Sequence, residues 1–424
     1  MATYVNDLRL KEIATGDESG TWGTSTNTNL ELIAEKFGAA SEALSDASTA
    51  TITMADGTSD AFRSMALTLT GSLSQACTVT LAPNTLSNVW VVQNSAGDTV
   101  TLTAGTGSNV VIPNGGIRMV ATDGAGAGAA VTDVLDVLGG TGNVGLGSGA
   151  FGTGLTTGTD NVAIGEAAGD ALTTGSDNTL IGDNAGGALT TGGSNVAVGS
   201  SALLTEDGNG NNVAVGFEAL KVLNAGTDGY NVAIGYQAGA SMTTGSSNTL
   251  IGGVSGDVIT TGSNNVGIGI NSLGALTTGS SNVGIGTAAL DSATTASNNT
   301  AVGHGALGAN TTGTENTAVG KGALAANTTA SAVTAFGEDA LGSNTTGSSN
   351  TAVGEGAMSA NSTASNNTAM GMAALVSNTT GEINSAFGSQ ALYTNTTGYG
   401  NTGIGRNALY TNNGNDNTAV GHEA

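Results

Sequence analysis

The chain has 424 residues and a formal net charge of −24, and only 3% of its residues are aromatic and 9% charged, whereas 70 are glycine. An acidic surface argues against nucleic acid or an anionic membrane as a partner, and it favours solubility. So few large apolar side chains are unable to build a thick globular core. A strict internal repeat argues against disorder, because a disordered segment has no reason to keep a fixed period.

The first residues carry charges, including Asp7, Arg9 and Lys11, where a secretory signal would need an apolar core. No stretch approaches the roughly 20 apolar residues of a membrane-spanning helix. We therefore expect neither a standard signal peptide nor a membrane helix.

A short amphipathic helix is predicted near residues 29–46, inside an N-terminal segment of residues 1–48. Thr28 and Glu31 have the spacing of a capping box, in which side chains satisfy the first free amides of a helix. The apolar residues that follow at roughly helical spacing are Leu30, Ile33, Ala34, Phe37 and Leu44. This stripe either packs against its own domain or forms a threefold bundle, and the pattern does not separate the two.

Residues 49–138 alternate with period two, which is typical of short strands, and are broken by Gly, Asn, Ser and Pro. The predicted strands are Thr51–Met54, Met65–Thr70, Thr78–Leu81, Val89–Gln93, Thr99–Thr103, Asn109–Ile112 and Ile117–Thr122. Strands at this spacing indicate a small β-sandwich or roll, with Trp90 in its core.

Residues 139–424 repeat one pattern in 17 copies: Asn, Val or Thr, a small residue, Val or Ile, and Gly, with Ala three residues further on. Counting positions 1 to 17 from the Asn puts this Gly at position 5 and the Ala at position 8. The position-5 residues are Gly147, Gly165, Gly182, Gly199, Gly216, Gly235, Gly252, Gly269, Gly286, Gly303, Gly320, Gly337, Gly354, Gly371, Gly388, Gly405 and Gly421. Their spacing is 17 residues, apart from single spacings of 18, 19 and 16. A fixed period with fixed chemistry indicates stacked identical units.

In a representative copy, Asn316 takes position 1, Val319 position 4, Gly320 position 5, Ala323 position 8 and Leu324 position 9. Positions 2 and 4 alternate with position 3, as in a short strand, and Gly permits a bend or a close backbone approach. In stacked coils the asparagines would form a hydrogen-bonded ladder. Each coil rises by about 4.8 Å, so the array would span on the order of 80 Å. The sequence predicts an all-β fold, a parallel β-solenoid or β-roll of about 17 coils that follows the helix and the small β domain.

The copies are of two kinds. Several early copies have Gly at position 9 and an apolar residue at position 12, as in Gly256 and Ile259. From Asn299 onward, complete copies have Leu or Met at position 9 and Asn at position 12, as in Leu307 and Asn310. We infer that one core slot is filled from either side of the coil, and that the late coils carry a second Asn ladder.

Positions 3 and 8 hold small residues, such as Ala318 and Ala323. A thin coil with small residues at fixed positions favours close lateral approach of further chains. We therefore predict a homotrimer that is held chiefly by the array.

Residues suited to catalysis or metal binding are sparse. His304 and His422 lie at position 6 without clustered carboxylates or cysteines, and most acidic residues occupy variable positions, as on a solvated face. We predict no enzyme activity, no cofactor, no metal site and no nucleic-acid partner.

Tyr393 and Tyr410 share position 10 in adjacent copies, and Tyr399 and Arg406 lie near them in the sequence. Stacked tyrosines would bind sugar rings, so these four residues form the predicted receptor-binding surface. The alternative is an aromatic ladder that only stabilises the last coils.

The repeats Asn-Thr-Ala-Val-Gly and Asn-Val-Ala-Ile-Gly resemble the head repeats of trimeric autotransporter adhesins, which form a left-handed parallel β-roll as a trimer. The stretch 303–320 resembles repeats of bacteriophage tail fibres more closely. Residues 3–140 are similar to the start of tail fibres of marine phages, on stretches that begin at Asp7, Gly20 and Asp123.

The resemblance implies a homotrimeric virion tail fibre, made in the host cytoplasm without a signal peptide. Its N-terminal region would dock on a tail or adaptor protein, and its array would project toward a host-surface glycan or protein. Trp22, Leu30, Ile33 and Phe37 are then the predicted attachment residues. We expect neither the signal peptide and membrane barrel of autotransporters nor the self-cleaving chaperone domain of many fibres.

Four alternatives stay open. Two are close to the main hypothesis, a trimeric cell-surface adhesin and a passive spacer fibre. An ice- or mineral-binding solenoid would need Thr-x-Thr on one face of nearly every coil. A polysaccharide-cleaving tailspike would need paired carboxylates in a groove, and the sequence suggests neither feature.

Overall fold

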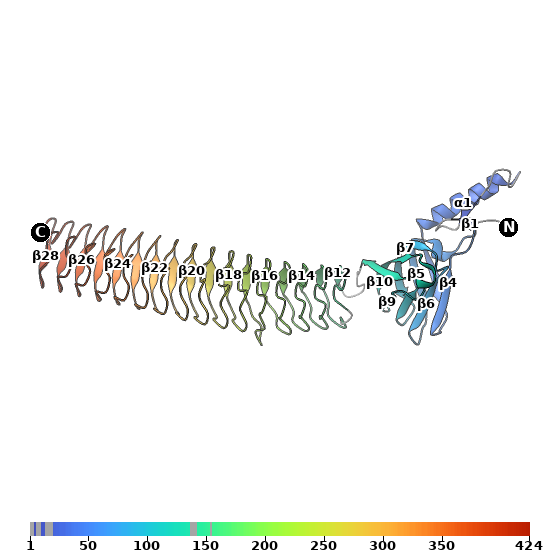
Figure 1. The fold of residues 1–424 in the computed structure, drawn as a ribbon, viewed down its shortest axis with the longest axis horizontal. Helices are drawn as coiled ribbons and strands as arrows, with labels where there is room; N and C mark the ends of the chain where they lie inside the picture. Colours follow the sequence, from blue (N-terminus) through green and yellow to red (C-terminus); the bar gives the residue numbers. More distant parts are fainter. Residues whose placement is uncertain (1–3, 6–9, 13–19, 136–141, 153–154) are drawn as a thin grey trace. The chain divides into compact units, whose positions relative to one another are not determined.

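The computed structural model describes residues 4–5, 10–12, 20–135, 142–152 and 155–424 (Figure 1). Contacts divide the chain into two units. One contains Met1–Ala150 and Thr159–Val162, and the other contains Phe151–Gly158 and Ala163–Ala424. The first unit holds the helix and a small β domain, and the second holds nearly all of the repeat array.

The helix α1 spans Trp22–Lys36, so the prediction of a helix over 29–46 was wrong at both ends. Thr28 lies inside the helix and does not cap it, and the N-cap residue Thr21 makes no side-chain cap bond. Residues Ala39–Leu44 form the strand β3, which pairs in parallel with β5 (Ala66–Gly71). Tertiary pairing overrides local helix preference in this segment, whose burial alternates as in a strand.

The small β domain contains all seven predicted strands, with small shifts at their ends, and two that were not predicted, β3 and β11. Besides β3 and β5, its strands are β4 (Thr49–Thr53), β6 (Cys77–Ala82), β7 (Ser87–Ser95), β8 (Val100–Thr103), β9 (Val110–Ile112), β10 (Ile117–Asp123) and β11 (Val131–Leu135). A two-residue pair, β1 (Tyr4–Val5) and β2 (Leu10–Lys11), and the short 3-10 helices η1 (Ala61–Arg63) and η2 (Gly126–Gly128) complete this part.

Strands β3 to β8 alternate between two sheets along the chain. The five-stranded sheet has the order β11-β10-β7-β5-β3, and the four-stranded sheet has the order β4-β6-β8-β9. The pairs β3/β5, β5/β7, β4/β6 and β6/β8 are parallel. The chain therefore winds as short coils before the antiparallel strands β9, β10 and β11.

Trp90 lies in the core of this domain, as predicted, with no exposed surface. Its ring stacks on Phe62 with centroids 4.5 Å apart, and its Nε1 donates a hydrogen bond of 2.8 Å to the Phe62 carbonyl. The buried indole N–H is thus satisfied, which a buried Trp requires.

The repeat array is a parallel β-solenoid, as predicted. Each copy contributes one three-residue strand, and the strands form a 17-stranded sheet in chain order (Figure 1). The strands are β12 (Val144–Leu146), β13 (Val162–Ile164), β14 (Thr179–Ile181), β15 (Val196–Val198), β16 (Val213–Val215), β17 (Val232–Ile234), β18 (Thr249–Ile251), β19 (Val266–Ile268), β20 (Val283–Ile285), β21 (Thr300–Val302), β22 (Thr317–Val319), β23 (Thr334–Phe336), β24 (Thr351–Val353), β25 (Thr368–Met370), β26 (Ser385–Phe387), β27 (Thr402–Ile404) and β28 (Thr418–Val420). Equivalent positions pair directly, as Thr317 does with Thr300 and Thr334.

The side chains at positions 3 and 8 point into the coil. Ala318 and Ala323 have no exposed surface in the single chain. The inference that these small residues form the contact between chains was therefore wrong. They are small because the coil interior is narrow, and the larger Val, Ile or Thr at positions 2 and 4 point outward.

Both predicted asparagine ladders are present. At position 1, the Oδ1 atom of Asn248 accepts hydrogen bonds from the backbone N and the Nδ2 of Asn265, at 3.0 and 3.1 Å. At position 12, the Nδ2 of Asn344 donates to Asn327 Oδ1 at 3.1 Å and to the Gly347 carbonyl at 3.0 Å. These asparagines are fully buried, so each side-chain amide needs a hydrogen-bond partner from the adjacent coil.

The two kinds of coil fill one core slot from opposite sides, as inferred. Leu172 at position 12 and Leu307 at position 9 are both fully buried. A Cβ placed on Gly256, at position 9 of an early coil, would lie 2.7 Å from Ile259 Cδ1. In most coils the slot is filled from position 9 or from position 12, but two coils bury a leucine from both positions, Leu220 with Leu223 and Leu273 with Leu276.

The position-5 glycines are required by conformation and by space. Gly252 has φ +137°, and a Cβ on it would lie 2.5 Å from the Gly269 carbonyl oxygen of the next coil. The neighbouring Gly253 has no positive φ, and a Cβ on it would meet nothing within 4 Å. These adjacent residues form a matched pair for a test.

We predict that Gly252→Ala destabilises the solenoid by about 3 kcal/mol or more, from backbone strain and overpacking together. Gly253→Ala should change the free energy of unfolding by less than about 0.5 kcal/mol, as at an ordinary surface position. Thermal unfolding followed by circular dichroism measures both, and equal melting temperatures for the two variants would contradict the assignment.

Ala323→Leu should destabilise the coil by about 1–3 kcal/mol, because the added methylene and methyl groups overpack a closed interior. Lys321→Ala removes an exposed ion pair with Glu338, 3.0 Å long, and should cost less than Ala323→Leu, because solvent screens an exposed pair. Urea unfolding of the two variants compares them, and a smaller loss for Ala323→Leu would place position 8 outside the core.

Candidate functional site

Tyr393 and Tyr410 are brought together as the sequence predicted. Their rings stack with centroids 4.9 Å apart and an angle of 3° between the planes. The Thr394 amide donates a 3.0 Å hydrogen bond to the Tyr410 carbonyl, so the backbone holds the two coils in register beside the rings. Both tyrosines are half-buried. This arrangement forms a short aromatic ladder.

Tyr399 and Arg406 lie in other rows of the solenoid. Tyr399, at position 16, is 49% exposed, and its backbone amide donates to Asn415 Oδ1 at 3.1 Å. Arg406, at position 6, lies 3.5 Å from His422 Nε2 through its Nη1 atom. The four predicted receptor-binding residues therefore fall into three rows, and only the two stacked tyrosines share one.

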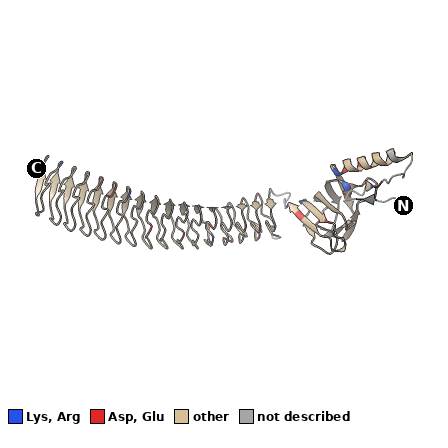
Figure 2. Cartoon of the chain, turned by 45° about the horizontal axis from the view of Figure 1, so that its top comes forward, with Lys and Arg blue, Asp and Glu red and all other residues tan. Residues whose placement is uncertain are grey.

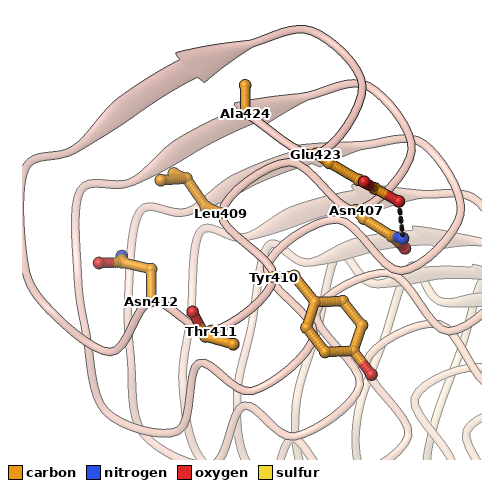
Figure 3. Close-up of a pocket in the computed structure, with 7 residues that line it drawn as sticks. All are labelled: Asn407, Leu409, Tyr410, Thr411, Asn412, Glu423 and Ala424. Carbon is orange, nitrogen blue, oxygen red and sulfur yellow. Dashed lines mark hydrogen bonds between the residues drawn. The ribbon is translucent and has the colours of Figure 1, made fainter.

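An open depression lies at the last coil (Figure 3). It is lined by Asn407, Leu409, Tyr410, Thr411, Asn412, Glu423 and Ala424. The Tyr410 side chain points away from Leu409, and Asn407 Nδ2 donates to Glu423 Oε1 at 3.5 Å. In earlier coils the corresponding face is covered by the next coil, so we assign no ligand to this depression.

The predicted attachment residues lie on or beside α1. Trp22 is its first residue. Leu30 is 59% and Phe37 75% exposed, and Ile33 is half-buried, whereas Leu32 is 2% exposed. The expected stripe is therefore divided: Leu30 and Phe37 are exposed, whereas Leu44, in β3, is buried in the core of the small β domain. Leu30, Ile33 and Phe37 are spaced so as to lie along one side.

A row of apolar side chains on the outer face of the solenoid was missed by sequence reasoning. It is formed by position 4, and its most exposed members are Ile164, Ile234, Phe336, Met370, Phe387, Ile404 and Val420, at 36–69% exposure. In the first half of the array position 2 adds Val, as in Val213 and Val232. No strand from β12 to β28 contains a charged residue (Figure 2). The sequence signal was the alternation of position 3 with positions 2 and 4, which separates two faces without showing which one is inside.

Several carboxylates in the array have shifted pKa values. Burial raises the pKa of Asp257 and of Asp291, which both occupy position 10, two coils apart. A hydrogen bond from Lys221, followed by one from Gln237, lowers the pKa of Glu218. A hydrogen bond to Glu338 raises the pKa of Lys321.

Metal and membrane sites were searched over the described part of the chain. Within those residues, no group of three or more His, Cys, Asp or Glu could hold a metal ion. Among the helices described, none is long and apolar enough to cross a membrane.

Comparison of the chain with protein-family models, with curated proteins and with solved structures gave no match.

Stacking of Tyr393 on Tyr410 should couple the two rings by about 0.5–1.5 kcal/mol beyond their separate contributions. Urea unfolding of the single variants Tyr393→Ala and Tyr410→Ala and of the double variant gives this coupling as a double-mutant cycle. A coupling energy of zero would mean that the ladder does not stabilise the last coils.

Proposed function

We propose that the protein is a bacteriophage tail-fibre protein, a virion appendage whose solenoid projects toward the host surface for adhesion. The observation that carries this proposal is the unbroken stack of strands β12 to β28 in one parallel sheet. Such a stack spans on the order of 80 Å. It is suited to hold a binding surface at a distance from an attachment point. The resemblance of both parts of the chain to tail fibres supports the role.

Self-association through the outer face belongs to this proposal. An exposed apolar row of this length needs a partner. A strip on the order of 80 Å by 10 Å offers roughly 800 Å² per chain, which is the size of a standard protein interface. A second copy has the same rise of about 4.8 Å per coil, so its row stays matched along the whole length. We therefore place the homotrimer contact at positions 2 and 4.

Attachment to a tail or adaptor protein is assigned to the N-terminal unit. The exposed Leu30 and Phe37 with Ile33 give α1 an apolar side that its own domain does not cover. An apolar helix face of this kind fits a groove on a partner, with anchors at i, i+3 and i+7.

Ile251→Lys with Ile285→Lys should convert the trimer into monomer, because two charges per chain would be buried without partners. Thr278→Lys, on an exposed corner of the coil between these two, is the control and should leave the trimer intact. Light scattering on the full chain gives the mass. A monomeric wild type, or an unchanged mass for the double variant, would overturn the assigned contact.

The virion role is tested by electron microscopy of purified phage with a gold-labelled antibody against the array. Label on tail appendages is expected, and virions without label would overturn the proposal. Tyr393→Ala with Tyr410→Ala should leave labelled fibres in place and lower adsorption to host cells. Normal adsorption would make the protein a spacer whose receptor contact belongs to another protein.

A further inference from the structure

A second group of aromatic residues lies in the middle of the solenoid. Position 6, directly after the motif glycine, holds Phe217, Tyr236, Gly253 and Ile270 in four successive coils. The carbonyls of Phe217, Tyr236 and Gly253 each accept a backbone hydrogen bond from the residue at position 7 of the next coil, at 2.9, 2.8 and 3.2 Å. These bonds hold the four residues in one row along the solenoid.

Phe217 and Tyr236 form a stacked pair at the surface. Their ring centroids are 5.6 Å apart, the planes differ by 11°, and the side chains are 46% and 55% exposed. Since Phe217 covers one face of the Tyr236 ring, the other face is directed along the row toward Gly253. This second face of the Tyr236 ring has no aromatic side chain stacked on it.

A slot lies over Gly253, between Tyr236 and Ile270. A Cβ on Gly253 would meet nothing within 4 Å, and Ile270 is 62% exposed. The two walls, Tyr236 and Ile270, are two coils apart, and two rises of about 4.8 Å give a separation of about 9.6 Å. A flat ring in contact with both walls needs about 3.5–4.0 Å on each side, or roughly 7–8 Å in all. The slot therefore accepts one saturated or flat six-membered ring.

Gln237, which follows Tyr236, is the polar residue on that side of the slot, and its partner Glu218 lies one coil further away, in the coil of Phe217. Gln237 Nε2 donates to Glu218 Oε2 at 2.7 Å, and Lys221 Nζ donates to Glu218 Oε1 at 2.6 Å. The bond from Lys221 and then that from Gln237 hold the pKa of Glu218 low, so its carboxylate is charged and orients the amide. A Gln amide has two donor hydrogens and an acceptor oxygen. One bond to Glu218 uses only one of these groups.

We propose that this slot binds a neutral hexopyranose ring of a glycan. The C–H face of the sugar would lie on Tyr236, its other face against Ile270, and its hydroxyls beside the Gln237 amide. A ring with hydroxyls around its edge matches apolar walls with a polar border better than an apolar ring does. The net charge of −24 disfavours acidic sugars. The site is separate from Tyr393 and Tyr410 and does not rest on the fibre role.

Saturation-transfer NMR on the purified full chain tests the proposal, with the methyl glycosides of glucose, galactose and mannose as probes. At least one glycoside should bind with roughly millimolar affinity, as expected for a single ring on an open surface. Gly253→Leu fills the slot at a position with space and no positive φ, so the coil should fold. Both Gly253→Leu and Tyr236→Ala should weaken binding by about tenfold or more.

Gly253→Ala and Thr278→Lys are the controls, and both should keep the wild-type affinity, the first because a methyl group leaves most of the slot open and the second because Thr278 is exposed at another corner. Absence of transfer to every glycoside would overturn the proposal. So would transfer that survives Gly253→Leu and Tyr236→Ala. Binding of N-acetyltyrosinamide without binding of any glycoside would assign the slot to a protein side chain and would also overturn it. The virion and adsorption experiments are unaffected by any of these results.

Discussion

The solenoid depends on buried asparagine side chains that only the neighbouring coil can satisfy. Each position-1 Asn offers its Oδ1 to the backbone amide of the next coil, as Asn282 does for Asn299 at 3.1 Å. A buried polar group left without a partner costs about 1–3 kcal/mol. The ladder fixes the register between neighbouring coils but not the length of each coil, because Asn231 still donates to Asn212 Oδ1 at 3.2 Å across the longer spacing. Val333 is an exception: its amide still donates to Asn316 Oδ1, but its side chain offers no hydrogen bond to the next coil.

The narrow interior follows from the same stacking and decides what the surface looks like. Position-5 carbonyls approach the next coil so closely that no side chain fits at Gly320, where a Cβ would lie 2.4 Å from the Gly337 oxygen. The interior is filled mostly by Ala at positions 3 and 8 and by one or two larger side chains per coil, such as Leu324 in one coil and Leu220 with Leu223 in another. The larger residues at positions 2 and 4 are left outside. An apolar surface on a protein with a thin core is thus a consequence of the coil geometry.

Much of this could be read from the sequence, because a repeat shows its constraints many times over. The period, the two Asn ladders and the exchange of Leu between positions 9 and 12 were all predicted. The sequence did not predict which face of each strand points into the coil, since alternation separates two faces without saying which one is inside. The helix ends were wrong because the segment Ala39–Leu44 has helix-forming residues but pairs with β5. The Phe217–Tyr236 pair was missed because position 6 is variable, and its meaning appears only when successive coils are stacked.

A stacked array of this kind separates the residues that fold it from the residues that give it a surface. The longest coil, with 19 residues between Gly216 and Gly235, shows that the length of a turn can change independently of the interior. The two additional residues leave the strand pairing intact, with Val213 opposite Val232 and Val215 opposite Ile234. Phe217 and Tyr236 still stack across the longer coil. Extra residues in a turn therefore disturb neither the ladder nor the outer rows. A binding site can arise wherever two or three adjacent coils change one outer position, with no change to the interior.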